Sequence, residues 1–520
     1  MRVLLMSTPY PLEENPIPPL SLSYLAAVLQ SEGIEVQILD LLVSQHSARK
    51  IRDKLAEYQP QMVGVTCVTL NSNIAARNLK VCKDFDPGIV TMLGGPHASF
   101  AIKETLLRSR WIDLVIIGEG ERTIVELART LEKGKDIQQV EGIAFREDNR
   151  VVKTEPRPLI EDLNELPIPA RHLLPLSKYH AIGAPCTIVT SRGCPYKCIF
   201  CSGPRLFGRR VRFRDPMLVV DEIEQIHKVF GFNWLNIVDD TFTLNHRHAH
   251  AVCDEIMRRN LKLEWTVFAR ADTVTADILK KMRQAGCSWL LFGAESASPE
   301  ILKTIKKGTT PEDIRRGTKL STEAGIGVFN SFIFGLPGES PETARQSLDF
   351  AAELNRDYDA KYGFHLLSPL PGTELYERPK DYGLRILSRN WAKYDANEPI
   401  TETPTMSPQM VMEHMADYDQ IITYVWQEIE RKAAEGDPTC SKELRQKASK
   451  EFIWRLLKGD VIERLGQMKD GSDPEGYLAQ KVSRKMGVPL DMAEQEMGRL
   501  VQMGLLKRES VNGRSLWLWS

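Results

Sequence analysis

Three cysteines, Cys194, Cys198 and Cys201, lie within the sequence SRGCPYKCIFCSGPR in the spacing CxxxCxxC. Thiolates at this spacing can wrap one compact metal cluster. A tetrahedral zinc site would need a fourth ligand, and no His or Cys follows at the distance typical of a zinc finger. We therefore predict a [4Fe-4S] cluster with one iron open for a small molecule, and structural zinc remains the alternative.

The cysteines follow the first of six predicted strands. From Thr187 the chain alternates short apolar runs with helical patterns, and every predicted strand except the last is followed by a helix. This order predicts a partial (β/α)6 barrel of the TIM type. Active sites of such folds lie at the carboxyl ends of the strands, which is where the cysteine motif falls.

A second α/β unit precedes the barrel. Residues 1–150 also alternate strands and helices, which implies a parallel, doubly wound (Rossmann-like) sheet with helices on both faces. Ligands of such sheets bind beyond the carboxyl ends of the strands. We expect residues 7–10, 66–71, 94–97 and 118–121 to surround one crevice.

The remaining sequence adds a connector and a helical end. The last part predicts two helices and a hairpin that turns at Asn512 and Gly513, an order similar to a winged helix. Its second helix is acidic, which disfavours binding in a nucleic-acid groove. The predicted divisions are a doubly wound domain (1–150), a proline-rich linker (151–185), a partial barrel (186–385), a helical region (386–455) and a winged-helix-like domain (456–520).

Composition limits the possible partners. The 520 residues include 68 basic and 69 acidic ones, so no net field attracts nucleic acid or anionic lipid. Apolar runs are far shorter than a membrane span, and the start MRVLLMSTPYP is too short for a signal peptide. Nine cysteines without an export signal favour free thiols and metal ligation. We expect a soluble, cytoplasmic, multidomain protein that binds neither nucleic acid nor membranes.

CxxxCxxC on the loop after the first strand of a partial barrel resembles the radical S-adenosylmethionine (SAM) enzymes. The resemblance implies that Cys194, Cys198 and Cys201 hold the cluster and that SAM binds at successive strand ends. Taken singly, each polar residue there could equally be a helix cap or an ion-pair partner. The implied contacts are Phe200 near the adenine, Asp239 or Asp240 at the amino group, Arg270 at the carboxylate, Glu295 and Ser296 at the ribose or carboxylate, and Leu336 and Pro369 as apolar walls.

A doubly wound domain before such a barrel resembles the cobalamin-binding class (class B) of this family. GGPHAS at 94–99 and GEGE at 118–121 are similar to that class, and their glycines let the backbone lie close to a corrinoid. An unliganded flavodoxin-like fold or a nucleotide domain is the alternative. The implied cobalamin contacts are Thr66, Leu70, Asn71, Gly94, Gly95, Pro96, His97, Gly118, Glu119 and Gly120.

The sequence departs from the class of B12 proteins that carry DxHxxG after the first strand. The corresponding loop reads STPYPLEENPIPPLS and has no histidine. We therefore expect base-off cobalamin with no protein histidine on the cobalt, and Leu70 or Asn71 could face its open side. His97 follows a different strand and is not expected to be the ligand.

The resemblance implies a cobalamin-dependent radical SAM C-methyltransferase that methylates an unactivated carbon through a 5′-deoxyadenosyl radical and methylcobalamin. The substrate would be a peptide, a protein or a natural product, and the C-terminal region could receive it. An electron donor such as flavodoxin or ferredoxin is implied, but no residue of the chain is singled out as catalytic. One alternative is a cyclase or oxidase of the tetrapyrrole-cyclase type, without methyl transfer. Another is a non-catalytic, regulatory cobalamin binder.

Overall fold

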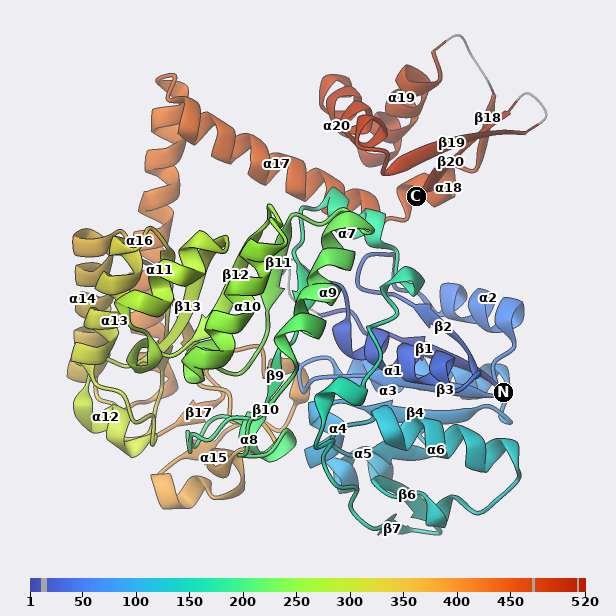
Figure 1. Cartoon of the computed structure of the whole chain (residues 1–520), viewed down its shortest axis with the longest axis horizontal. Coiled ribbons are helices and arrows are strands. Elements are labelled where there is room, and N and C mark those ends of the chain that lie inside the picture. Colours follow the sequence, from blue (N-terminus) through green and yellow to red (C-terminus); the bar gives the residue numbers. More distant parts are fainter. Residues whose placement is uncertain (11–15, 470–472, 512–513) are drawn as a thin grey trace.

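The computed structural model describes residues 1–10, 16–469, 473–511 and 514–520. The N-terminal part is a seven-stranded sheet in the order β2-β1-β3-β4-β5-β6-β7, with helices on both faces (Figure 1). The core strand β1 reads RVLLM and is almost wholly buried, as expected of a strand covered on both faces. The strands are β1 (Arg2–Met6), β2 (Glu35–Leu39), β3 (Met62–Thr66), β4 (Val90–Gly94), β5 (Leu114–Ile116), β6 (Ile143–Glu147) and β7 (Arg150–Lys153). The helices are α1 (Leu20–Ser31), α2 (Ala48–Tyr58), α3 (Ser72–Phe85), α4 (Pro96–Phe100), α5 (Ile102–Arg108) and α6 (Glu121–Glu132).

The edge of this sheet differs from the all-parallel prediction. Strands β1 to β5 pair in parallel, but β6 runs antiparallel to β5 and β7 antiparallel to β6. Glu147 pairs with Arg150, so Asp148 and Asn149 form a two-residue turn, with Asp148 at φ 52°. Asp and Asn accept such a left-handed conformation, which favours a hairpin here over a further crossover helix.

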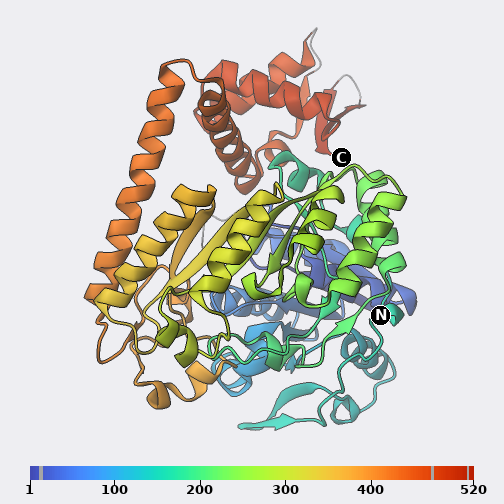
Figure 2. The same cartoon turned by 60° about the vertical axis from the view of Figure 1, so that its left-hand side comes forward.

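The barrel prediction is confirmed. Six parallel strands form one open sheet in the order β15-β14-β13-β12-β11-β8, covered on its outer side by helices (Figure 2). Thr310 and Ser340 each form a capping box followed by proline, so α13 and α14 begin at sequence-encoded caps. The strands are β8 (Cys186–Ile188), β11 (Trp234–Ile237), β12 (Glu264–Ala269), β13 (Cys287–Glu295), β14 (Gly327–Phe334) and β15 (Lys361–Leu366). The helices are α9 (Pro216–Lys228), α10 (His246–Arg258), α11 (Ala276–Gln284), α12 (Pro299–Thr304), α13 (Pro311–Glu323) and α14 (Pro341–Tyr358).

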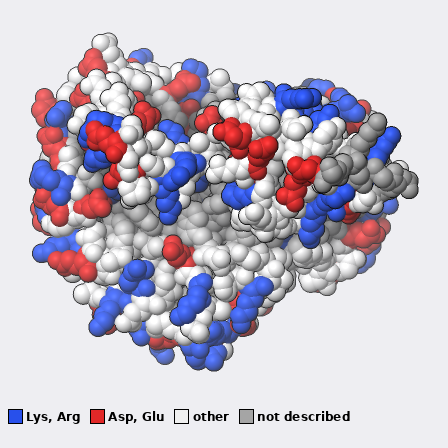
Figure 3. Space-filling model, turned by 90° about the horizontal axis from the view of Figure 1, so that it is seen from above, with Lys and Arg blue, Asp and Glu red and all other residues white. Residues whose placement is uncertain are grey.

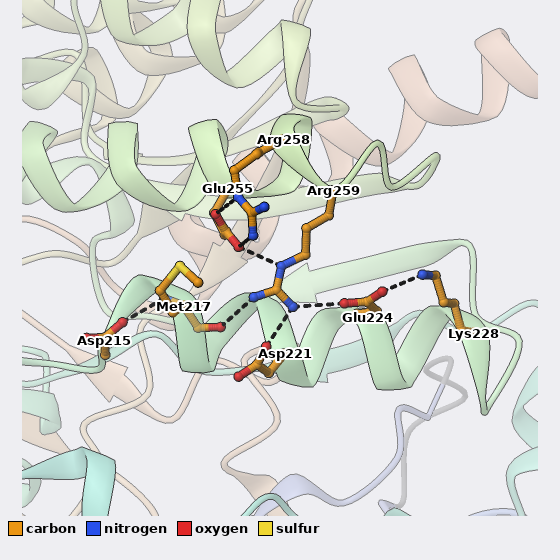
Figure 4. A network of polar contacts seen from close by, with 8 residues as sticks. All are labelled: Asp215, Met217, Asp221, Glu224, Lys228, Glu255, Arg258 and Arg259. Carbon is orange, nitrogen blue, oxygen red and sulfur yellow. Dashed lines mark hydrogen bonds and ion pairs between the residues drawn. The ribbon is translucent and has the colours of Figure 1, made fainter.

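An ion-pair network joins two neighbouring helices of the barrel (Figure 4). Arg259, just after α10, donates to Asp221 (2.6 Å) and Glu224 (2.8 Å) of α9 and to Glu255 of its own helix (2.6 Å). Hydrogen bonds from Arg258 and Arg259 lower the pKa of Glu255 to about 2. One guanidinium therefore links α9 to α10.

The chain continues beyond the barrel through short elements into long helices and a small C-terminal sheet. The two strands of the predicted hairpin pair antiparallel, while its turn residues Asn512 and Gly513 lie outside the described residues. A third strand, β18, was not predicted, and the sheet order is β18-β20-β19. The elements are α7 (Leu176–Ala181) in the connector, then α15 (Glu374–Glu377), β16 (Arg385–Ile386), β17 (Thr401–Glu402), α16 (Pro408–Ala434), α17 (Pro438–Lys458), α18 (Val461–Leu465), β18 (Gln467–Lys469), α19 (Pro474–Met486), α20 (Leu490–Gln502), β19 (Leu506–Val511) and β20 (Arg514–Trp519).

The C-terminal module, residues 459–520, packs at one end of the barrel. Glu463 forms an ion pair with Lys178 (2.6 Å), and Arg499 donates to the carbonyl of Ala181 (3.2 Å). Lys178 and Ala181 precede β8, whereas the cysteines follow it. The module and the cysteine motif therefore lie at opposite ends of the barrel (Figures 1 and 2). This placement does not support the expectation that the C-terminal module receives the substrate.

The surface carries mixed charge. Basic and acidic side chains are interspersed on the face in Figure 3, as expected from a net charge of -1. Among the described residues, no helix combines the length and the apolarity that crossing a membrane would require.

Candidate functional site: a cysteine loop beside an interdomain cavity

The three cysteines lie on one closed loop. We call residues 193–211 the cysteine loop, because they connect β9 (Ser191–Arg192) to β10 (Arg212–Phe213) and contain the whole motif. The two strands pair antiparallel at the base of the loop, and the amide of Cys194 donates to the carbonyl of Gly208 (3.1 Å). The loop also carries the short helix α8 (Gly203–Leu206). All three thiols are free.

The three thiols lie close enough to influence one another. Desolvation raises the pKa of Cys201 to about 11, and the charges of Asp240, Cys198 and Cys194 also raise it. Bound iron would relieve this repulsion, because a cation stabilises thiolates. A side chain at Gly203 would press on the Asp240 carboxylate and approach the sulfur of Cys201. The donor set therefore fits a thiolate-bound cluster, although no three His, Cys, Asp or Glu side chains in the described part of the chain converge on one metal-ion position.

The two aspartates after β11 have different surroundings. Asp239 is buried and accepts hydrogen bonds from the amide and hydroxyl of Thr190 and from the Ser191 hydroxyl, at 2.5 to 2.7 Å. The Thr190 hydroxyl also lies 3.0 Å from Nε2 of His248. Asp240 instead faces the cysteine loop, and desolvation together with the charge of Asp239 raises its carboxyl pKa. Only Asp240 is thus placed to contact a ligand.

Arg270 lies at the end of β12 beside the cysteine loop. Its guanidinium forms two hydrogen bonds with Asp272, both 2.9 Å, and lies 3.5 Å from the ring centroid of Tyr196. Tyr196 lies between Cys194 and Cys198 in the sequence, so the arginine supports the loop as well as facing the strand ends. The SAM carboxylate that was predicted to pair with Arg270 would have to share this guanidinium with Asp272.

The end of β13 holds a buried ion pair that the sequence did not reveal. Glu295 pairs with Lys307 (2.7 Å), and Gly293 leaves the space that this pair occupies. Glu295 adopts φ 65°, a left-handed conformation that is costly for a residue with a side chain. Ser296 is buried and its hydroxyl accepts from the Ser298 amide (3.1 Å), so it shapes the turn instead of facing a ligand.

The predicted apolar contacts lie around the same strand ends. Phe200 is half-buried against the barrel core, and Leu336 and Pro369 are buried just after β14 and β15. The turn after β14 is held by Glu339, whose carboxylate accepts from the Gly335 amide (2.6 Å). Burial raises the pKa of Glu339 to about 8.

A cavity of about 770 Å³ lies between the strand ends of the seven-stranded sheet and the base of the cysteine loop. Its size is that of a cofactor pocket. Of the residues predicted to contact cobalamin, all but two line it. Leu70 does not, and neither does His97, which is buried between Thr69 and Trp391 and whose pKa burial lowers to about 4. The predicted residues that line the cavity are Thr66, Asn71, Gly94, Gly95, Pro96, Gly118, Glu119 and Gly120.

The cavity wall suits a bulky ligand with polar edges. A side chain added at Gly94 or Gly118 would meet nothing within 4 Å, so these glycines border open space. Gly95 has φ 97°, and a side chain there would collide with the Cys67 carbonyl. The buried hydroxyls of Thr8 and Tyr24, both in the wall, have no hydrogen-bond partner among the described residues. A buried unpaired hydroxyl is costly, so these groups favour a polar ligand.

The barrel supplies the opposite wall, which sequence reasoning missed. Asp240 belongs to this wall and also lies beside Cys201, so the cavity reaches the cysteine loop. Only the contact between the two domains brings these residues together, and no residue spacing in the sequence predicts that contact. The barrel residues are Thr187, Val189, Ser191, Arg192, Leu206, Phe207, Val238 and Asp240.

Comparison with known proteins agrees with this geometry. Residues 188–351 match the family model of the radical SAM superfamily, and residues 14–128 match that of the B12 binding domain. An uncharacterized methyltransferase of Pyrococcus horikoshii is 35% identical over 395 residues, which are 76% of this chain and 85% of the relative. An anaerobic magnesium-protoporphyrin IX monomethyl ester cyclase of Rubrivivax gelatinosus is 31% identical over 399 residues, or 75% of this chain and 70% of the relative.

Two solved structures share the fold. The radical SAM methyltransferase TsrM of Kitasatospora setae, with cobalamin and a [4Fe-4S] cluster bound, matches with a TM-score of 0.64 and 25% identity, over 79% of this chain and 84% of that one. OxsB, a cobalamin-dependent SAM radical enzyme with aqua-cobalamin and SAM bound, matches with a TM-score of 0.69 and 20% identity, over 97% of this chain and 79% of that one. The chain belongs to the cobalamin-dependent radical SAM enzymes of the methyltransferase type.

Proposed function

We propose that this protein methylates an unactivated carbon of a peptide, protein or natural product. The observation that carries the proposal is the continuity of the site. One cavity extends from the glycine-rich strand ends of the B12-binding domain to the cysteine loop, and Asp240 belongs to both. A substrate carbon between two cofactors could therefore be reached by each without leaving the site.

The proposed cofactors are a [4Fe-4S] cluster on Cys194, Cys198 and Cys201, SAM at the strand ends, and cobalamin in the cavity. When bound, they would supply reductive cleavage of SAM for hydrogen abstraction from the substrate, and the methyl group that is transferred. An external electron donor such as flavodoxin or ferredoxin would be needed. We assign the SAM amino group to Asp240, because both carboxylate oxygens of Asp239 already accept hydrogen bonds from Thr190 and Ser191.

We further propose that no protein histidine ligates the cobalt. Supporting this, His97 is turned toward Trp391, and the described part of the cavity wall contains no histidine. Asn71 lines the cavity and is fixed by hydrogen bonds to Val68 and Thr8, so it is a better candidate than Leu70 for the side of the corrinoid facing the sheet.

The test uses anaerobically purified, reconstituted protein. We expect about four irons per chain and one cobalamin, and both 5′-deoxyadenosine and S-adenosylhomocysteine after incubation with SAM and a reductant. Cys198→Ala should lose the cluster and deoxyadenosine formation while retaining cobalamin. Cys440→Ala, on α17, is the matched control and should change neither. Zinc in place of iron would contradict the proposal.

The cyclase alternative is supported by the relative from Rubrivivax gelatinosus, whose name describes ring closure. The products separate the two reactions. Deoxyadenosine without S-adenosylhomocysteine, in the presence of substrate, would favour cyclisation or oxidation. A substrate product heavier by one methyl group would favour methyl transfer.

A further inference from the structure

A buried group of ion pairs crosses between the two cofactor-binding domains. Glu119, after β5 of the B12-binding domain, accepts from Arg212 (2.9 and 3.0 Å) and from Arg192 (3.1 Å) of the barrel. Arg192 also pairs with Glu121 (2.6 Å). The side chains of Glu119, Arg192 and Arg212 are only 3%, 9% and 4% exposed. Such a desolvated, multiply hydrogen-bonded pair fixes geometry strongly.

The two arginines depend on this carboxylate. Arg192 and Arg212 lie directly opposite each other in the β9–β10 pair that closes the base of the cysteine loop. Like charges at directly opposite positions destabilise an antiparallel pair, most of all where water is excluded. Glu119 supplies a negative charge shared by both, and it comes from the other domain. The closed base of the loop is therefore completed only when the domains are docked.

The ion pair of Glu119 with Arg192 also lies next to both proposed cofactor sites along the chain. The neighbours of Glu119, Gly118 and Gly120, line the cavity. On the barrel side, Arg192 is separated from Cys194 by a single residue, Gly193, which has φ 105° and whose added side chain would collide with the carbonyl of Arg210. The backbone between the ion pair and the first cysteine therefore has little freedom.

Glu119 is not free to bind a ligand itself. One carboxylate oxygen accepts from Arg192 and Arg212, and the other from Arg212 and the Ile160 amide (2.8 Å). We propose that Glu119 is a positioning residue that sets the cysteine loop against the cobalamin cavity, and thereby the separation of cluster and cobalt. The inference rests on the cofactors assigned under the proposed function.

The decisive measurement compares wild-type protein with Glu119→Gln, each holding a reduced cluster and cob(II)alamin. Electron paramagnetic resonance in frozen solution reports the dipolar interaction between the two unpaired spins, which depends steeply on their separation. We expect a weaker and broader interaction in Glu119→Gln. A shift of about 1 Å can cost up to about a hundredfold in rate. S-adenosylhomocysteine formation should therefore fall about tenfold or more, and deoxyadenosine formation much less.

Two controls separate positioning from stability. Glu222→Gln removes another buried carboxylate shared by two arginines, Arg171 and Arg214, each 2.6 Å away. Among the described residues, no hydrogen bond or ion pair joins this carboxylate to residues 1–150. Asp221→Asn weakens the network of Figure 4, none of whose residues lines the cavity. Both should keep the wild-type spin interaction and product ratio, whatever they cost in melting temperature.

Each outcome decides the inference. An unchanged spin interaction and product ratio in Glu119→Gln overturns it, as does an equal change in Glu222→Gln. If Glu119→Gln does not fold, Arg212→Lys replaces it, because lysine keeps the positive charge but loses the planar guanidinium that binds both carboxylate oxygens. Its spin interaction and product ratio are then compared with those of wild type and Glu222→Gln. Wild-type protein with iron but no cobalt would overturn the proposed function and this inference together, whereas a failure confined to Glu119→Gln leaves the proposed function intact.

Discussion

Single residues at the site divide into those that face the cavity and those that hold the loop. The adjacent aspartates after β11 show this most clearly, because their environments assign them different tasks. Three donors from Thr190 and Ser191 surround Asp239, whereas Asp240 faces Cys201 and the cavity. Their sequence, DD, carries no sign of this difference.

We predict opposite effects of the two amide substitutions. Asp240→Asn should weaken SAM binding about tenfold, because a charged hydrogen bond is lost, with little change in melting temperature. Asp239→Asn should lower the melting temperature, since an amide cannot accept all the bonds made by Thr190 and Ser191, at a cost of about 1 to 3 kcal/mol. SAM titration of the cluster signal and thermal unfolding measure the two effects. Equal loss of SAM affinity in both variants would contradict the assignment.

Glu339 gives a pH dependence of stability. Its pKa rises from 4.5 to about 8 on folding, so between these values the folded chain binds more protons than the unfolded chain. Stability from this group is therefore lost as pH rises, by up to about 1.4 kcal/mol per pH unit. Glu339→Gln should gain melting temperature relative to wild type as pH increases from 5 to 8. A difference that stays constant with pH would disprove the shift.

The cysteine motif was predictable because its spacing is local, and so were the glycines at strand ends. Lys307 and Tyr24 were not. Lys307 meets Glu295 only through a turn after α12, and Tyr24 enters the cavity wall from α1. Their roles depend on how distant segments pack, which apolar periodicity does not encode.

At the scale of elements, the alternating pattern predicted both sheets because β/α repeats admit few topologies. It missed the β6–β7 hairpin, whose signal was the short polar turn at Asp148 and Asn149. It also missed β18, a strand of three residues. The edge strand β7 buries little, so its sequence carries a weak apolar pattern.

The α9–α10 network provides an element-scale prediction. Arg259→Ala should reduce stability by about 1 kcal/mol, because a shared partner is lost to three carboxylates, two of which, Asp221 and Glu224, remain in contact with water. Cluster content and deoxyadenosine formation should be unaffected, since the network faces away from the strand ends. Thermal unfolding with iron analysis tests this. Loss of the cluster in Arg259→Ala would show that α9 and α10 control the cysteine loop.

For the whole molecule, the C-terminal module is held against both other domains. Asp460 accepts from Lys50 (2.7 Å) and from the Gln45 amide (3.0 Å) of the B12-binding domain. Asp460→Ala should loosen the module and increase proteolysis near residue 460. SAM cleavage should persist, because the module lies at the end of the barrel away from the cysteines. A parallel loss of deoxyadenosine would instead indicate that the module stabilises the site.

The cavity wall has a consequence for how the protein is assembled. Because one side belongs to the seven-stranded sheet and the other to the barrel, a corrinoid bound there is enclosed as the domains dock. Separating these two walls would break the buried contacts of Glu119 with the two arginines. We therefore expect cobalamin to enter empty, folded protein more slowly than it would enter a pocket formed by one domain alone.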